Sequence, residues 1–171
     1  AKTFVEQWAP RVDNLKHARH RGMLRVILGE TIEQQRFFEQ ALRQAPADAD
    51  PRTRAAMLSN LALVEKGTGH YDQALRFSID ALEQQRRIGD LAGEALSLNN
   101  LGALHLDRGD FAAAGEYLKP GLALCDRHGL ISTRGLVLAN LTSAALNLGQ
   151  HDAAEAHARR ALEHAEAAGN R

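Results

Sequence analysis

The sequence predicts an all-α fold built from repeated helix pairs, and three observations support this prediction. Alanine, leucine, glutamate, glutamine and arginine are abundant among the 171 residues, whereas aromatic residues make up 5% and prolines number four. This composition favours helix over strand. Many residues recur at intervals of 40 positions, and a glycine stands at each point where the helical apolar spacing stops. We therefore expect an α-solenoid of four antiparallel helix pairs.

The 40-residue register is defined by positions that hold the same residue in three successive copies. These sets are Leu58, Leu98 and Leu138; Leu61, Leu101 and Leu141; Gly69, Gly109 and Gly149; Ala74, Ala114 and Ala154; Leu82, Leu122 and Leu162; and Gly89, Gly129 and Gly169. A more divergent copy precedes them, in which Gly22 aligns with Gly102 and Gly29 with Gly69. The copies cover approximately residues 10–45, 51–90, 91–130 and 131–170 of a single domain spanning 1–171.

Each copy is expected to form two helices, and the connector APADADP at residues 45–51 separates the first pair from the second. In the third copy, Leu98, Leu101, Gly102 and His105 fall at i, i+3, i+4 and i+7, which is one face of a helix. Gly109 suits the left-handed residue that ends this helix. Asp110 is the N-cap candidate of the next helix.

The second helix of the third copy carries Ala114, Leu118 and Leu122 on one face and is expected to end at Gly129. Pro120 lies inside it and predicts a kink, because proline removes one helical hydrogen bond. The other copies follow the same plan.

The third copy resembles the tetratricopeptide repeat in its spacing of Leu98-x2-Leu101-Gly102-x2-His105 and Ala114-x3-Leu118. HEAT repeats have a similar period but lack this pattern. The 40-residue period is similar to that of repeats in large bacterial signalling and transcription regulators. The resemblance implies a right-handed superhelix whose first helices line a concave groove. Gly102 and Ala114 are expected where the two helices of a repeat approach closely.

The groove implied by the resemblance would contain Asn60, Asn100 and Asn140, which are 40 residues apart and directly precede a leucine. Their amides could hydrogen-bond the backbone of an extended peptide. The alternative is that duplicated repeats simply inherited them. Further groove candidates give a mildly basic, amide-rich surface suited to an acidic peptide or a terminal carboxylate, and they are Asn99, Lys16, Arg19, His20, Arg54, Arg134, Ser143 and Asn147.

Composition and motifs argue against several classes of function. Lysine plus arginine (21) balances aspartate plus glutamate (21), so the net charge does not favour nucleic acid. The single cysteine, Cys125, cannot form an internal disulfide and is expected to be buried. Without an apolar stretch of about 18 residues, no membrane span is expected. Phosphate-binding, dinucleotide and hydrolase motifs are absent, and the histidine spacings offer too few ligands for a metal site. No enzyme activity, cofactor or metal is expected.

The sequence therefore predicts a non-catalytic, cytoplasmic scaffold that binds a protein or peptide segment in the groove, as a fragment of a larger bacterial regulator. The alternative function is a sensor of a small inducer, with a local pocket near Pro120, that switches an attached DNA-binding or ATPase module. No direct contact with nucleic acid or membrane is expected. The last helix would expose Ala158, Ala161, Leu162 and Ala165, which favours a homodimer through this helix.

Overall fold

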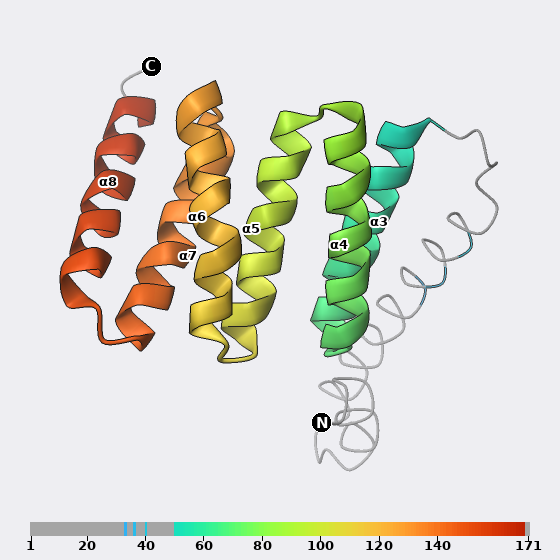
Figure 1. Ribbon diagram of the computed structural model, residues 1–171, viewed down its shortest axis with the longest axis horizontal. Coiled ribbons are helices and arrows are strands. Elements are labelled where there is room, and N and C mark those ends of the chain that lie inside the picture. The colour runs from blue at the N-terminus through green and yellow to red at the C-terminus, as the bar shows by residue number, and fades with distance from the viewer. Residues whose placement is uncertain (1–32, 34–35, 37–39, 41–49, 170–171) are drawn as a thin grey trace, which may run out of the picture. The chain divides into compact units, whose positions relative to one another are not determined.

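The computed structural model describes residues 33, 36, 40 and 50–169 of the chain. The described part contains helices and turns without strands, so the predicted all-α class is confirmed. Six helices are labelled in Figure 1: α3 (Pro51–Thr68), α4 (Tyr71–Ile88), α5 (Leu91–Asp107), α6 (Phe111–His128), α7 (Ile131–Asn147) and α8 (His151–Gly169). The helix pair expected at residues 10–45 lies outside the described residues, apart from residues 33, 36 and 40.

The glycines of the 40-residue register end the helices, as the sequence predicts. Within the pairs, Gly69, Gly109 and Gly149 have φ angles of 84°, 80° and 70°. Between the pairs, Gly89 and Gly129 have φ angles of 67° and 64°. All five angles lie in the left-handed region, where a side chain would be strained. Each pair is therefore closed by a backbone conformation that glycine adopts easily.

Aspartates precede three of the helices, but they do not all act in the same way. Asp50 accepts hydrogen bonds from the backbone N–H groups of Arg52 and Thr53, and Asp90 accepts one from Gly93 at 3.0 Å. Asp110 occupies the N-cap position of α6 without making a side-chain capping bond. Its carboxylate instead lies 3.5 Å from Nε of Arg108. The sequence located this helix start correctly, but the expected capping bond is not made.

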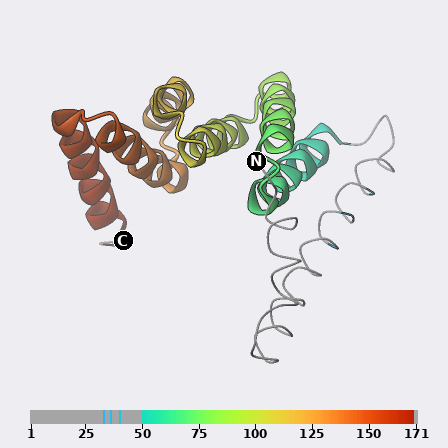
Figure 2. The same cartoon turned by 90° about the horizontal axis from the view of Figure 1, so that it is seen from below.

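The chain divides into two compact units, residues 1–81 and 82–171. In the second unit, α6 packs against both α5 and α7, while α5 also contacts α7 directly and α8 packs against α7 (Figure 2). The first helices of successive repeats thus touch each other, and α6 fits between them. This is the neighbour-on-neighbour packing expected of a helical repeat. Pro120 is accommodated within α6, which is one helix from Phe111 to His128.

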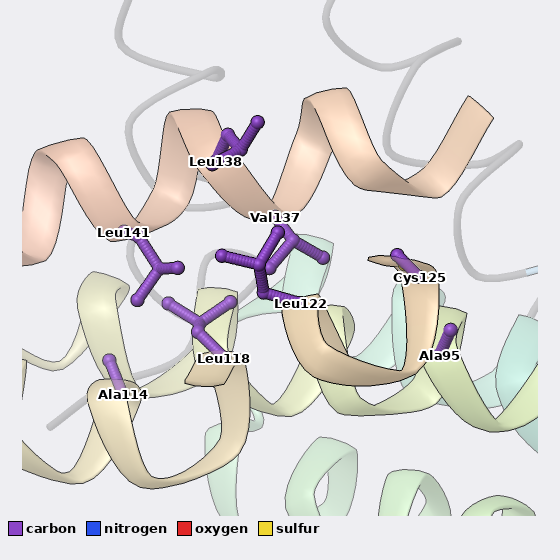
Figure 3. Packing of buried hydrophobic residues seen from close by; sticks show 8 residues of the cluster. All are labelled: Ala95, Ala114, Leu118, Leu122, Cys125, Val137, Leu138 and Leu141. Carbon is purple, nitrogen blue, oxygen red and sulfur yellow. The ribbon is translucent and has the colours of Figure 1, made fainter. Parts of the chain in front are cut away.

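The core of the second unit is formed by small and branched apolar side chains from three helices (Figure 3). It contains Ala95 of α5, Ala114, Leu118, Leu122 and Cys125 of α6, and Val137, Leu138 and Leu141 of α7. Cys125 is buried as predicted, and burial raises the pKa of its thiol. A methyl group built on Gly102 would lie 2.4 Å from Cγ of Leu118. The expected close approach of α5 and α6 at Gly102 is therefore confirmed.

In the first unit, α3 buries one apolar face and a polar group at its end. Leu58, Leu61 and Ala62 are all buried. Glu65 is fully buried, and its Oε2 lies 2.8 Å from Nδ1 of His70 in the turn that leads to α4. Nδ1 of His70 also lies 2.9 Å from Oγ1 of Thr68, and the position of Glu65 holds His105 and Ala145 in the later repeats.

Candidate binding surface

Among the side chains that the core leaves uncovered, each first helix of a repeat includes a row at recurring register positions. The row occupies positions i, i+4, i+7 and i+11, which fall within an arc of about 60° on an α-helix. We call it the stripe of that helix. The stripes consist of Ala56, Asn60, Leu63 and Gly67 on α3; Leu96, Asn100, Ala103 and Asp107 on α5; and Leu136, Asn140, Ser143 and Asn147 on α7. All of these residues are exposed or half-buried.

The three predicted asparagines occupy the same position of their stripes. Asn60 is exposed on α3, whereas Asn100 on α5 and Asn140 on α7 are half-buried. Helices α5 and α7 are in direct contact, so Asn100 and Asn140 lie on neighbouring helices of one unit. Asn60 lies in the first compact unit.

Asn99 lies between helices rather than on a stripe. Only 6% of its surface is exposed, and its Oδ1 accepts a hydrogen bond of 2.9 Å from Nδ2 of Asn140. This bond joins α5 to α7 and fixes the orientation of the Asn140 amide. The sequence placed Asn99 beside Asn100 as a ligand contact, but its burial favours an indirect role as a positioning residue for Asn140.

Arg134 points away from the α7 stripe and takes part in a charged cluster with the second helices. Its Nε donates to Oδ1 of Asp126 at 2.7 Å, and its Nη1 lies 3.3 Å from Nδ1 of His164. Arg160 donates to the other carboxylate oxygen of Asp126. Partial burial would raise the pKa of Asp126, but these hydrogen bonds from arginine outweigh it and hold the pKa below its usual value of 3.8. The contacts of Arg134 are therefore intramolecular.

The other residues predicted to contact a ligand lie on α7, on α3 or outside the described residues. Ser143 and Asn147 are exposed on the α7 stripe, where Asn147 Nδ2 donates to the Ser143 carbonyl at 2.8 Å. Arg54 is half-buried on α3, at the register position that Arg134 occupies on α7. Lys16, Arg19 and His20 lie outside the described residues.

The stripes of α5 and α7 are nearly uncharged, and Arg134 is the one basic residue of the expected surface that lies on these two helices. Besides Arg134, the two helices contain only Glu94 and Asp107 as charged residues. Glu94 is paired with Arg86 of α4 at 2.8 Å. Asp107, at the end of the α5 stripe, is thus the single charged side chain on the two stripes. A surface without a cation has no particular affinity for an acidic segment.

Sequence reasoning missed the leucines of the stripes. Leu96 and Leu136 are 40% and 53% exposed, and Leu63 on α3 is 52% exposed. Leu96 and Leu136 share a register position and precede Asn100 and Asn140 by four residues, so each leucine lies one turn from an asparagine on the same face. This i, i+4 spacing could have identified them, but leucines in a helical pattern are ordinarily assigned to the core.

Other kinds of site receive no support from the described part of the chain. Its histidine, cysteine, aspartate and glutamate side chains form no group of three or more that could hold a metal ion. None of its helices combines the length and apolar character needed to cross a membrane. A shallow depression open to solvent lies at the turn between α7 and α8, lined by residues 149–153, and Pro120 is not among its lining residues.

Comparison with known proteins shows which repeat family part of the chain is similar to. Residues 53–127 match the family model of the tetratricopeptide repeat. This stretch of the chain is similar to tetratricopeptide repeats. It begins in α3 and ends in α6, and it includes the turn glycines Gly69, Gly89 and Gly109. Tetratricopeptide repeats generally mediate protein–protein interactions, and the family is typically non-catalytic.

A solved structure has a similar fold. The crystal structure of BtubC (BKLC) from P. vanneervenii aligns with 90% of this chain and 80% of its own, with a TM-score of 0.54 and 18% sequence identity. At this identity the similarity shows the fold alone, which is that of a helical repeat. A search of curated proteins found no match.

Proposed function

We propose that this chain is a non-catalytic scaffold that binds a protein or peptide segment along the stripes of its first helices. The observation that supports this most directly is the position of Asn60, Asn100 and Asn140. All three lie on faces that the core does not use, although asparagine is a poorer helix former than alanine. Amides on such faces are suited to hydrogen-bonding a ligand backbone.

The proposed setting is a cytoplasmic bacterial regulator in which these repeats form one module. The 40-residue period supports this setting, because regulators of that class have repeats of similar length. In such a protein the scaffold would hold a partner or a segment of the regulator itself, and contact with nucleic acid would belong to another module. A small inducer remains the alternative ligand.

The test is a pull-down from lysate of the source cells, with captured proteins identified by mass spectrometry. Wild type is compared with the triple variant Asn60→Ala, Asn100→Ala and Asn140→Ala. The matched control is Arg76→Ala, Glu116→Ala and Gln150→Ala, which replaces three exposed polar residues away from the stripes and leaves the net charge unchanged. Circular dichroism verifies that all three proteins are folded.

The proposed function requires that wild type and the control capture the same partner and that the stripe variant loses it. Capture of the same proteins by all three would show that binding uses another surface and that the asparagines are inherited. If none of them captures a protein, the small-inducer function is favoured over the scaffold.

A further inference from the structure

Helix α8 packs beside α7 (Figure 1) through a side that has no large apolar residue. Its buried or half-buried residues are alanines, an arginine and two histidines: Ala153, Ala154, His157, Arg160, Ala161 and His164. Leu162, the one leucine of the helix, is exposed. Because small side chains remove little apolar area from water, hydrophobic burial holds α8 only weakly. The polar contacts of its histidines therefore weigh heavily in the docking of α8.

The two histidines occupy positions that have uncharged side chains in the preceding repeat. His157 corresponds to Tyr117 of α6, and His164 corresponds to Leu124. Leu124 is half-buried against the core. A leucine never carries a charge, and a tyrosine is neutral up to a pH of about 10. A histidine instead changes its charge between about pH 5 and pH 8, so α8 has two proton-binding groups on a side where α6 has none in that range.

His164 contacts α7 in a way that requires its neutral form. Its Nδ1 lies 3.3 Å from Nη1 of Arg134. A guanidinium can only donate hydrogen bonds, so Nδ1 of His164 must accept. A methyl group built on Gly135 would lie 3.4 Å from Cδ2 of His164, which places the ring directly against α7. Protonation of Nδ1 would remove the acceptor and bring a second cation against Arg134.

His157 also lies in surroundings that oppose its protonated form. Its Nδ1 is buried without a hydrogen-bond partner in the described structure. Burial, followed by the charges of Arg160 on the same helix and Lys119 on α6, lowers its pKa. Helix α7 offers no carboxylate that could offset these charges, since Arg134 is its single charged residue.

The nearby carboxylate of α6 is already engaged by cations. Asp126 accepts a hydrogen bond of 2.7 Å from Arg134 and one of 2.8 Å from Arg160. The carboxylates of α8 itself are on its exposed side, where Glu155 pairs with Arg159. Proton binding by the two histidines would therefore add positive charge to a contact region that already contains Lys119, Arg134 and Arg160.

We propose that α8 is a pH-sensitive helix, docked on α7 near neutral pH and released in mild acid when His157 and His164 bind protons. Release breaks the contact of His164 with Arg134 and that of Arg160 with Asp126, and it uncovers the side of α7 that α8 covers.

The preceding helix pair lacks this response. Its histidine, His105, lies 3.7 Å from a carboxylate oxygen of Asp110, so protonation there creates an ion pair between the end of α5 and the start of α6. Mild acid is therefore expected to loosen α8 selectively while α5 and α6 stay together.

Hydrogen exchange of the complete chain at pH 7.5 and pH 5.5, followed by mass spectrometry of its fragments, tests this inference. Each observed rate is divided by the intrinsic rate of the unfolded sequence at the same pH, so the ratio measures protection alone. A histidine that binds its proton only after release shifts the equilibrium by up to about tenfold between these pH values. Fragments of α8 should lose about tenfold or more of their protection at pH 5.5, whereas α5 and α6 retain theirs. Unchanged protection of α8, or an equal loss in α5 and α6, would overturn the inference.

A pair of substitutions assigns the response to the two histidines. His157→Tyr with His164→Leu gives α8 the residues of α6 at these positions and should make its protection the same at both pH values. The matched control, His151→Tyr with His128→Leu, removes two exposed histidines by the same changes and should respond to pH as wild type does. A response that persists in the first pair, or disappears in the control, would contradict the assignment. The wild-type comparison needs no substitution and decides the inference even if a variant fails to fold.

Discussion

At the scale of single residues, the contact between the two helices of a repeat depends on a balance of side-chain sizes. In the middle described repeat, Gly102 faces Leu118, and the leucine fills the space that the glycine leaves. The corresponding residues are Ala62 and Ser78 in the repeat before it, and Thr142 and Ala158 in the repeat after it. Glycine occurs opposite the largest partner, whereas alanine and threonine occur opposite small ones. The glycine of the repeat signature is therefore required by its partner rather than by its backbone angles.

Gly102→Ala should accordingly destabilise the protein, although alanine is the better helix former. The added methyl group would lie 2.4 Å from Cγ and 2.5 Å from Cδ2 of Leu118, so the two helices must move apart. Overpacking of this kind costs about 1–3 kcal/mol of unfolding free energy. The control is Gly115→Ala in α6, whose methyl group would approach only the end of Lys119 at 3.9 Å. That change should stabilise by about 0.5–1 kcal/mol. Urea unfolding of both variants measures the difference, and equal effects would contradict the size balance.

His157 is a second residue whose behaviour depends on its register position. Phe77 and Tyr117 occupy the same position in the preceding repeats, and Tyr117 stacks on His105 at 5.3 Å. His157 is half-buried, and its Nδ1 is buried without a hydrogen-bond partner in the described structure. Burial, together with the positive charges of Arg160 and Lys119, lowers the pKa of His157 below its usual 6.5. An imidazole therefore occupies the position of an aromatic ring, in surroundings that disfavour its protonated form.

This lowered pKa predicts a loss of stability in mild acid. Below pH 6.5 the unfolded chain binds a proton at His157 more readily than the folded chain, so unfolding becomes more favourable as the pH falls toward the folded pKa. The contribution is fully present above pH 6.5. His157→Phe, which restores the residue type of position 77, should remove this part of the pH dependence. Urea unfolding at pH 7.5 and pH 5.5 measures it, and the variant should gain more at the lower pH. An equal gain at both pH values would show that His157 does not titrate as inferred.

At the scale of the elements, an ion pair recurs between successive helices with its charges exchanged. Arg86 of α4 pairs with Glu94 of α5 at 2.8 Å, and Asp126 of α6 pairs with Arg134 of α7 at 2.7 Å. Positions 86 and 126, like 94 and 134, are equivalent in the 40-residue register. Both junctions therefore have an attractive ion pair, with the positive and negative residues exchanged between the two helices. Because charged residues at these register positions form ion pairs within the chain, a cation that recurs at one register position does not by itself indicate a ligand contact.

The elements were predictable from the sequence because their signals are local. Turn glycines such as Gly109 and Gly129 end helices through their own backbone freedom, and the apolar spacing of Leu98 and Leu101 determines which face is buried. The capping bond of Asp110 was not predictable in the same way. Its carboxylate can be drawn to nearby cations such as Arg108, and the spacing of residues does not determine which partner prevails.

The candidate surface was only partly predictable, because it depends on contacts between repeats. The register located Asn100 and Asn140 on equivalent faces, which follows from helix geometry alone. It could not show that Asn99 is buried against Asn140, or that Arg134 turns toward Asp126 and His164. Those contacts join residues from separate helices of the repeats. The removal of Arg134 from the expected basic surface follows from them.

At the scale of the whole molecule, α8 leaves uncovered a face that its counterpart α6 buries. Leu162 is 60% exposed, whereas Leu122 at the same register position is 7% exposed. Ala158 and Ala165 are exposed, whereas Leu118 and Cys125 are fully buried. In α6 this face packs against α7. We propose that a second copy of the chain covers the α8 face and forms a homodimer.

Replacing Leu162 should separate the two subunits without unfolding either one. Leu162→Gln removes the largest exposed apolar side chain of α8, and its loss from the centre of a small interface should shift the equilibrium toward monomer. The control is Leu148→Gln, because Leu148 is 43% exposed and lies in the turn before α8. Sedimentation equilibrium over a range of concentrations should give a dimer for wild type and the control, and a monomer for Leu162→Gln. A monomeric wild type at every concentration would exclude this assembly, and a dimeric Leu162→Gln variant would place the interface on another face. Since the stripes lie on first helices and Leu162 lies on a second helix, peptide binding by the monomeric variant should persist, which separates assembly of the molecule from recognition by its repeats.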